Sequence, residues 1–186
     1  MPKIFSDDTA EKAKGKKVFI YMGSDSDLEV VHPATVTLKQ IGIPYFIQVV
    51  SAHRTPHDVE RYAWLAKQSD GKVIIAAAGG AAHLPGMLAS FSTLPVIGIP
   101  VKTSTLSGVD SLYSIVQMPA GVPVAAMAIN GAENAALLAA QIIGTSDPDV
   151  AHKLESHKVR LEDKVEVMRT GLLAKIIELN KAKGIE

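Results

Sequence analysis

The stretch Lys17-Val-Phe-Ile-Tyr-Met22, followed by Gly23, decides the fold of this 186-residue chain. It is a short apolar run of β-branched and aromatic residues that ends at a glycine, which is the pattern of a buried strand. From residue 27 to residue 41 apolar side chains recur at helical spacing, and Gly42 ends this second pattern. A buried strand followed closely by a helix is the repeating unit of a parallel sheet.

The same alternation continues along the chain. Strand patterns recur at residues 45–50, 72–77, 95–99 and 122–128, and helical patterns at 55–68, 84–90, 108–116 and 133–143. Thr55 and Pro56 begin one of these helices, with Thr55 as the expected N-cap. Five strands that alternate with helices imply βαβ crossovers. We therefore expect a doubly wound parallel sheet of five strands in a three-layer α/β/α sandwich.

Three segments differ in their content of polar, apolar and charged residues. Residues 1–16 form a polar N-terminal extension, residues 17–144 the α/β domain, which we expect to be the catalytic domain, and residues 145–186 an extra C-terminal helix. The last segment is charged, with a thin apolar stripe made of Val150, Leu154, Leu161, Val165, Met168, Leu172 and Ile176. The stripe can pack on its own domain or on a neighbouring subunit, and we expect an oligomer contact.

The composition excludes several classes of function. Nineteen Lys and Arg balance nineteen Asp and Glu, so the chain has no overall field that would gather nucleic acid or an anionic membrane. Aromatic residues make up only 5% and cysteine is absent, which removes base-stacking platforms, disulfides, Cys-ligated metal and thiol nucleophiles.

Two apolar stretches, 73–101 and 119–144, are long enough to imitate membrane spans. Both contain prolines, glycines or polar residues that are typical of loops, so we interpret them as buried strand–turn–helix units. The N-terminus is polar and does not resemble a secretory signal. We expect a cytoplasmic protein that binds neither membrane nor nucleic acid.

Ligands of open parallel sheets bind beyond the carboxyl ends of the strands, so the residues after each strand are the candidates for a site. After the first strand come Ser24, Ser26 and Asp27, whose hydroxyls and backbone N–H groups can hold a phosphate and whose carboxylate can accept from ribose hydroxyls. Simple helix capping by Ser26 or Asp27 explains this loop about equally well.

The second strand is followed by Ser51, His53 and Arg54. Histidine exchanges protons near neutral pH, and arginine grips phosphate with two parallel hydrogen bonds. The alternative is a loop histidine bonded to the backbone. His57 lies four residues further on, but Pro56 and the start of a helix separate the two histidines. We therefore expect no metal site there.

The third strand is followed by a loop that has almost no side chains before its histidine. Its backbone N–H groups can approach a flat or anionic ligand closely, although tight packing between helix and strand would favour the same residues. The residues concerned are Gly79, Gly80, Ala81, His83 and Leu84. Together the three loops suit proton transfer on a small phosphorylated substrate, without a metal, a cofactor or a covalent nucleophile.

Three runs resemble the PurE family of purine biosynthesis. They are Met22-Gly-Ser-Asp-Ser-Asp27, Val50-Ser-Ala-His-Arg-Thr-Pro56 and Ala78-Gly-Gly-Ala-Ala-His-Leu-Pro-Gly-Met87. The resemblance covers about residues 17–144 and implies a flavodoxin-like fold and a homo-octamer with active sites at subunit contacts. It also implies an isomerase, N5-carboxyaminoimidazole ribonucleotide (N5-CAIR) mutase, which moves a carboxylate from an exocyclic nitrogen to ring carbon C4. His53 would be the acid and base.

The same resemblance assigns the remaining roles. Ser24 and Asp27 would bind the ribose phosphate, Ser26 and Arg54 would assist at the phosphate, and His83 with the residues 79–82 would line the aminoimidazole and carboxylate region. Ser51 and Leu84 complete the substrate-binding set.

Two alternatives remain open. The first is aminoimidazole ribonucleotide carboxylase on the same fold, although that branch typically carries His-Lys and Arg-Ser-Asn where this chain has His-Arg and Gly-Gly-Ala. The second is a non-catalytic receiver or flavodoxin-like binding module. It is disfavoured because no aspartate follows the third strand.

Overall fold

The computed structural model describes residues 7–184 and confirms a five-stranded, all-parallel sheet. The strands are β1 (Val18–Met22), β2 (Tyr45–Val49), β3 (Val73–Gly79), β4 (Val96–Val101) and β5 (Ala125–Ala126). They lie in the order β2-β1-β3-β4-β5, which is the flavodoxin-like order of a doubly wound sheet.

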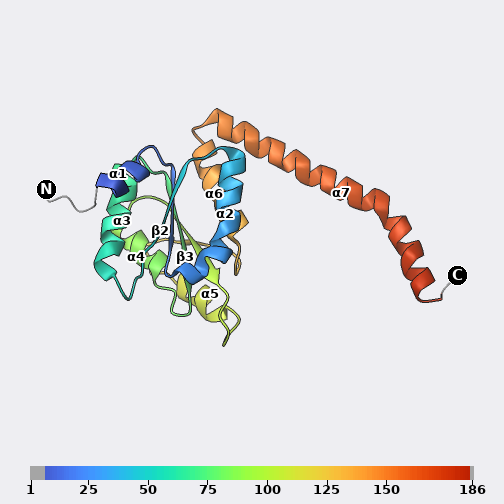
Figure 1. Ribbon diagram of the computed structural model, residues 1–186, viewed down its shortest axis with the longest axis horizontal. Coiled ribbons are helices and arrows are strands. Elements are labelled where there is room, and N and C mark those ends of the chain that lie inside the picture. The colour runs from blue at the N-terminus through green and yellow to red at the C-terminus, as the bar shows by residue number, and fades with distance from the viewer. Residues whose placement is uncertain (1–6, 185–186) are drawn as a thin grey trace.

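Helices cover both faces of this sheet. The chain forms α1 (Asp7–Ala13), α2 (Leu28–Ile41), α3 (Pro56–Gln68), α4 (Leu84–Phe91), α5 (Val109–Val116), α6 (Ala132–Gly144) and α7 (Pro148–Ala182). Figure 1 shows α1, α3 and α4 on one side of the sheet and α2 and α6 on the other. The expected three-layer α/β/α sandwich is therefore confirmed.

The two faces of the sheet carry two separate cores, and β1 contributes to both. Val18, Ile20 and Met22 point into the core beneath α2 and α6, whereas Phe19 and Tyr21 point into the core beneath α3, α4 and α5. All five residues are buried, because a strand in the middle of a parallel sheet has no solvent-exposed side. The one polar group among these five side chains, the Tyr21 hydroxyl, donates to the Tyr62 carbonyl at 2.8 Å.

The fifth strand is shorter than its sequence pattern predicts. Only Ala125 and Ala126 pair as a strand, against Ile97 and Gly98 of β4, where the pattern predicts residues 122–128. An edge strand has one neighbour, and Pro123 lacks the N–H that a longer ladder needs. The backbone contact nevertheless continues, since the Met127 N–H donates to the Gly98 carbonyl at 2.9 Å.

The N-terminal extension is only partly a polar tail. Residues 1–6 lie outside the described residues, but α1 follows directly, and Ala13 at its end is fully buried in the core beneath α3. At α3 itself Pro56 occupies the first turn as expected. Thr55 makes no side-chain cap bond, and its hydroxyl donates to the Ser51 carbonyl.

Helix α7 begins on the domain and then leaves it (Figure 1). Asp147 caps it by accepting from the N–H groups of Asp149 and Val150, and Val150 is buried against α6 with only 7% of its surface exposed. At 3.6 residues per turn, the face of Val150 continues as an exposed apolar stripe. The stripe consists of Leu161, Val165, Met168, Leu172, Ile176 and Leu179, which are 41–62% exposed.

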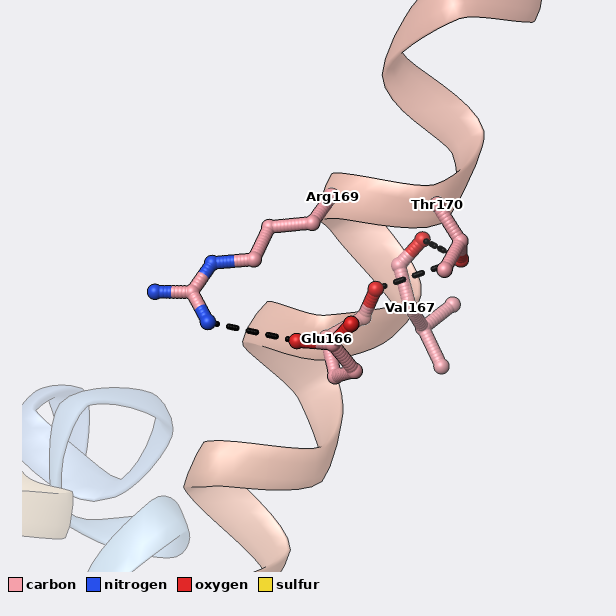
Figure 2. A network of polar contacts seen from close by, with 4 residues as sticks. All are labelled: Glu166, Val167, Arg169 and Thr170. Carbon is pink, nitrogen blue, oxygen red and sulfur yellow. Dashed lines mark hydrogen bonds and ion pairs between the residues drawn. The ribbon is translucent and has the colours of Figure 1, made fainter.

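The distal part of α7 is held by contacts within the helix. Arg169 pairs with Glu166 at 3.2 Å, and the Thr170 hydroxyl donates to the carbonyls of Glu166 and Val167 (Figure 2). Threonine hydroxyls bonded in this way tend to bend a helix, and Gly171 follows directly. Among residues 7–184 no helix is both long and apolar enough to cross a membrane.

Candidate active site

The loops after β1, β2 and β3 meet at the carboxyl edge of the sheet around a cavity of about 410 Å³. They are adjacent because β1 lies between β2 and β3, and the chain reverses its direction of progress across the sheet at β1. Ligands of doubly wound folds bind at such a switch point. The lining residues are Gly23, Ser24, Asp27, Ser51, Ala52, His53, Arg54, Ala78, Gly79, Ala81, Ala82, His83 and Leu84.

Most of the site residues expected from the sequence therefore lie together. Two of the expected residues are not in the lining set: Ser26 is exposed beside the cavity, and Gly80 is turned away into a contact with α5. Three lining residues were not singled out from the sequence, namely Gly23, Ala52 and Ala78. Their small size leaves no chemical signal in a sequence, although each is adjacent to a residue that was singled out.

The loop after β1 forms a capping box at one end of the cavity. Ser24 is the N-cap of a 3₁₀ turn (Asp25–Asp27), and its hydroxyl accepts from the Ser26 N–H at 3.4 Å. In return the Asp27 carboxylate accepts from the Ser24 N–H at 3.3 Å. Capping by Ser26 or Asp27 was the alternative to phosphate binding for this loop; the cap is in fact Ser24, with Asp27 as the reciprocal partner.

Burial of Asp27 sets the electrostatics of this end. Asp27 is only 9% exposed, and burial raises the pKa of its carboxyl above the ordinary value. Hydrogen bonds from the Ser24 and Gly23 backbone and the Ser26 side chain lower this pKa, as does the positive charge of the nearby Arg54 guanidinium, but these effects are weaker than burial. A buried carboxylate that keeps an unused lone pair toward a cavity is a strong acceptor for a ligand hydroxyl.

Arg54 links the loops after β1 and β2. Its Nη2 donates to the Gly23 carbonyl at 2.8 Å, and its Nε donates to the Ser51 hydroxyl at 3.2 Å. These two bonds fix the plane of the guanidinium, which has five N–H donors in all. The remaining donors stay available at the rim of the cavity, where they can bind an anionic ligand.

His53 and His83 are in direct contact in the middle of the cavity wall. The distance from His53 Nε2 to His83 Nδ1 is 2.8 Å, and the two rings stand edge to face with centroids 4.9 Å apart. One nitrogen donates and the other accepts, so a single proton lies between the rings. The sequence shows both histidines but not this contact, because 30 residues separate them along the chain.

No acidic side chain completes a metal site here. Among residues 7–184, no group of three or more His, Cys, Asp or Glu side chains is arranged to hold a metal ion. The side chains available for chemistry at this edge are thus the coupled imidazoles, the buried carboxylate, the guanidinium and the hydroxyls.

Comparison with known families identifies the fold and the loops together. The model of the AIR carboxylase family matches residues 17–164, which covers all five strands and the three loops. Over 149 residues the chain is 58% identical to the N5-carboxyaminoimidazole ribonucleotide mutase of Thermotoga maritima, a match that covers 80% of this chain and 87% of that protein.

A second relative carries a different name. The phosphoribosylaminoimidazole carboxylase of Saccharomyces cerevisiae is 55% identical over 148 residues, which is 80% of this chain but 26% of that protein. Among solved structures, PurE from Treponema denticola superposes with a TM-score of 0.78 at 30% identity, covering 84% of this chain and 98% of that one. With the sheet order and the three loops, these matches show that the chain belongs to the AIR carboxylase family, the family of the PurE proteins.

Proposed function

We propose that this protein is an N5-carboxyaminoimidazole ribonucleotide mutase, an isomerase that converts N5-CAIR into 4-carboxy-5-aminoimidazole ribonucleotide (CAIR). The observation that carries the proposal is the contact between His53 and His83, which lies in a cavity beside Arg54 and Asp27. The identity to a curated mutase supports it further.

The nucleotide would enter with its phosphate toward the loops after β1 and β2. Arg54 and the hydroxyls of Ser24 and Ser51 offer donors to the phosphate, and the Asp27 carboxylate offers an acceptor to the ribose hydroxyls. Ser26, which is exposed, acts through its bond to Asp27 rather than as part of the cavity wall. The base would then extend toward Gly79, Ala81, His83 and Leu84.

His53 would move the proton in both halves of the reaction. In the first half the bond from the exocyclic nitrogen to the carboxylate breaks, carbon dioxide is released into the cavity, and His53 gives a proton to that nitrogen. In the second half C4 attacks carbon dioxide, and the proton on C4 returns to His53. The substrate and product are isomers, so neither ATP nor a redox partner is consumed.

His83 would keep His53 ready for both steps. A hydrogen bond from one imidazole to the other orients the ring of His53 and holds a second site for the proton 2.8 Å away. The methyl groups of Ala52, Ala78 and Ala82 line the same cavity and add no group that would react with carbon dioxide. Enclosure of this neutral intermediate near C4 replaces activation by a strong electrophile.

We also propose that the protein works as a homo-oligomer, with an octamer as the expected state. The support comes from α7, whose apolar stripe continues beyond the domain with no cover from the described residues of the same chain. A stripe of six large apolar side chains on an exposed helix is typical of an interface.

A single assay distinguishes the proposed activity from its alternative. Purified protein is supplied with N5-CAIR in the absence of ATP, and CAIR formation is followed; the mutase predicts rapid conversion. The name of the yeast relative favours a carboxylase as the second candidate, which would instead convert aminoimidazole ribonucleotide and bicarbonate. Turnover with only the second pair of substrates would overturn the proposal.

A further inference from the structure

The loop that carries His83 is hydrogen-bonded to two serines of α5, Ser111 and Ser114, which do not line the cavity. Gly80, at the turn of this loop, has a φ of +67°, a conformation that residues other than glycine rarely adopt. A Cβ at Gly80 would meet nothing within 4 Å, so the position requires glycine for its backbone angle and not for space. A backbone conformation with positive φ is maintained only where the surrounding contacts hold it.

Both backbone groups of Gly80 are bound by α5. The Gly80 N–H donates to the Ser111 hydroxyl at 2.9 Å. The Gly80 carbonyl accepts from the Ser114 hydroxyl at 3.2 Å, and this hydroxyl shares its one hydrogen with the Asp110 carbonyl at 2.8 Å. Hydroxyl groups 31 and 34 residues further along the chain thus fix the orientation of this one peptide turn.

The Ser111 hydroxyl is fully engaged in hydrogen bonds within the protein. Its side chain is 0% exposed, and its only hydroxyl hydrogen is donated to the carbonyl of Val101, at the end of β4, at 2.7 Å. The lone pairs that remain accept from Gly80. Ser111 therefore ties the end of β4 to the loop that follows β3.

Three residues after Gly80 the chain reaches His83, the first contact of His53. Ala82 and Leu84, on either side of His83, are buried, so the backbone there has little room to adjust. A change in the direction of the chain at Gly80 would be passed to the His83 ring, and the 2.8 Å contact to His53 tolerates little displacement.

From this arrangement we propose that Ser111 is a positioning residue of the active site, which holds the Gly80 turn so that His83 meets His53. Ser114 supports the same turn through the carbonyl of Gly80. Neither serine lines the cavity, so neither is expected to touch the substrate. The inference rests on the proposed mutase activity for its kinetic readout, although the geometry it predicts does not.

The test compares Ser111→Ala with a matched variant elsewhere in the core. Thr37→Ala also removes a buried hydroxyl that donates to a backbone carbonyl, that of Pro33, but it lies in α2 and has no contact with the loop. Both variants are expected to lower Tm. Only Ser111→Ala is expected to reduce kcat, by about 10- to 100-fold, with KM changed less than about threefold, because the phosphate-binding loops are untouched.

Two further variants keep the test decisive if Ser111→Ala does not fold. Ser114→Ala removes the hydroxyl that the carbonyls of Gly80 and Asp110 share, and Gly80→Ala strains the turn without a clash. Both variants should show a smaller loss of the same kind, in kcat and not in KM. Unchanged kcat in all folded variants, together with a lower Tm, would reduce Ser111 to a structural residue and overturn the proposal.

A crystal structure of Ser111→Ala or Ser114→Ala separates this inference from the proposed function. We expect the distance from His53 Nε2 to His83 Nδ1 to exceed hydrogen-bond range, whatever reaction the protein catalyses. If the contact stays at 2.8 Å, the positioning role is wrong even if the mutase activity is established. Conversely, a wild-type protein without mutase activity would refute the function and leave this measurement intact.

Discussion

At the scale of single residues, the proposed chemistry depends on His53 and Asp27. His53 Nε2 lies 2.8 Å from His83 Nδ1, so the two imidazoles share a proton at the wall of the cavity. Asp27 is buried near Arg54, and burial raises the pKa of its carboxyl. Substitution of either residue should therefore have an effect that its exposed neighbours do not show.

Replacement of His53 by Asn is expected to reduce kcat by at least about 10²-fold, because a general acid–base group typically contributes a rate factor of about 10²–10⁴. Substrate should still bind, since the groups that hold the phosphate are unchanged. Steady-state kinetics and calorimetric titration measure the two effects. The matched control is His57→Asn, an exposed histidine outside the cavity, which should keep normal activity. Near-normal turnover of His53→Asn would remove it from the acid–base role.

Replacement of Asp27 by Asn is expected to stabilise the fold while weakening substrate binding. Because burial raises the carboxyl pKa in the folded state, the ionised group destabilises the fold, and this effect develops as pH rises through the interval above the ordinary pKa. At neutral pH we expect Tm to rise by roughly 2–4 °C and KM to rise at least about tenfold.

The pH dependence checks the sign of that prediction. As pH falls through the same interval, wild-type Asp27 becomes protonated and the Tm advantage of Asp27→Asn should shrink. Asp25→Asn, on the same loop but exposed, is the control and should change Tm little at any pH. A Tm advantage that grows toward low pH would show that burial does not dominate at Asp27.

At the scale of elements, local patterns predict the positions of strands and helices well, and the differences arise at the edges. The strand at 122–128 shortens to Ala125–Ala126 because it lies at the edge of the sheet, which no local pattern reveals. Likewise, Thr55 is a residue type that favours an N-cap. Its hydroxyl nevertheless donates to the Ser51 carbonyl, since the preceding loop folds back on it. The tight packing of β4 against its helices allows a further prediction.

Gly98→Ala in β4 is expected to lower the free energy of unfolding by about 1–3 kcal/mol, because the new Cβ would lie 2.5 Å from Ile115 Cγ2 and 3.3 Å from Pro85 Cβ. Gly171→Ala in α7 is the matched substitution. Its Cβ would meet nothing within 4 Å, so we expect a gain of about 0.5–1 kcal/mol from helix propensity. Denaturant unfolding measures both, and equal effects would show that space at Gly98 is not limiting.

At the scale of the whole molecule, α7 is the helix whose apolar side chains are not covered by the described residues of the same chain. The face that packs on α6 at Val150 continues without cover over six exposed apolar residues, 161 to 179 (Figure 1). The family model ends at residue 164, so most of this stripe lies in a part of the chain that the family does not describe. An oligomer would bury it.

Leu172→Glu combined with Ile176→Glu is therefore expected to reduce the mass of the assembly measured by light scattering, because two charges would be placed on the stripe. Val167→Glu is the control. It also lies in α7 and is 71% exposed, but it points away from the stripe by the helical period, and the mass should not change. If the double variant keeps the wild-type mass, α7 does not hold subunits together.

The sequence by itself determined the parallel sheet, the three loops at its carboxyl edge and the residue types in them, because apolar periodicity and glycine positions are local properties. The tertiary structure alone decided that His53 meets His83, that Asp27 is buried, and that Ser111 and Ser114 hold the turn at Gly80. The contacts of His53 and Gly80 join residues about 30 positions apart, and they follow from the strand order, which places β2, β1, β3 and β4 next to one another in that order. Strand order arises from the packing of the whole domain, so no segment of the sequence encodes it.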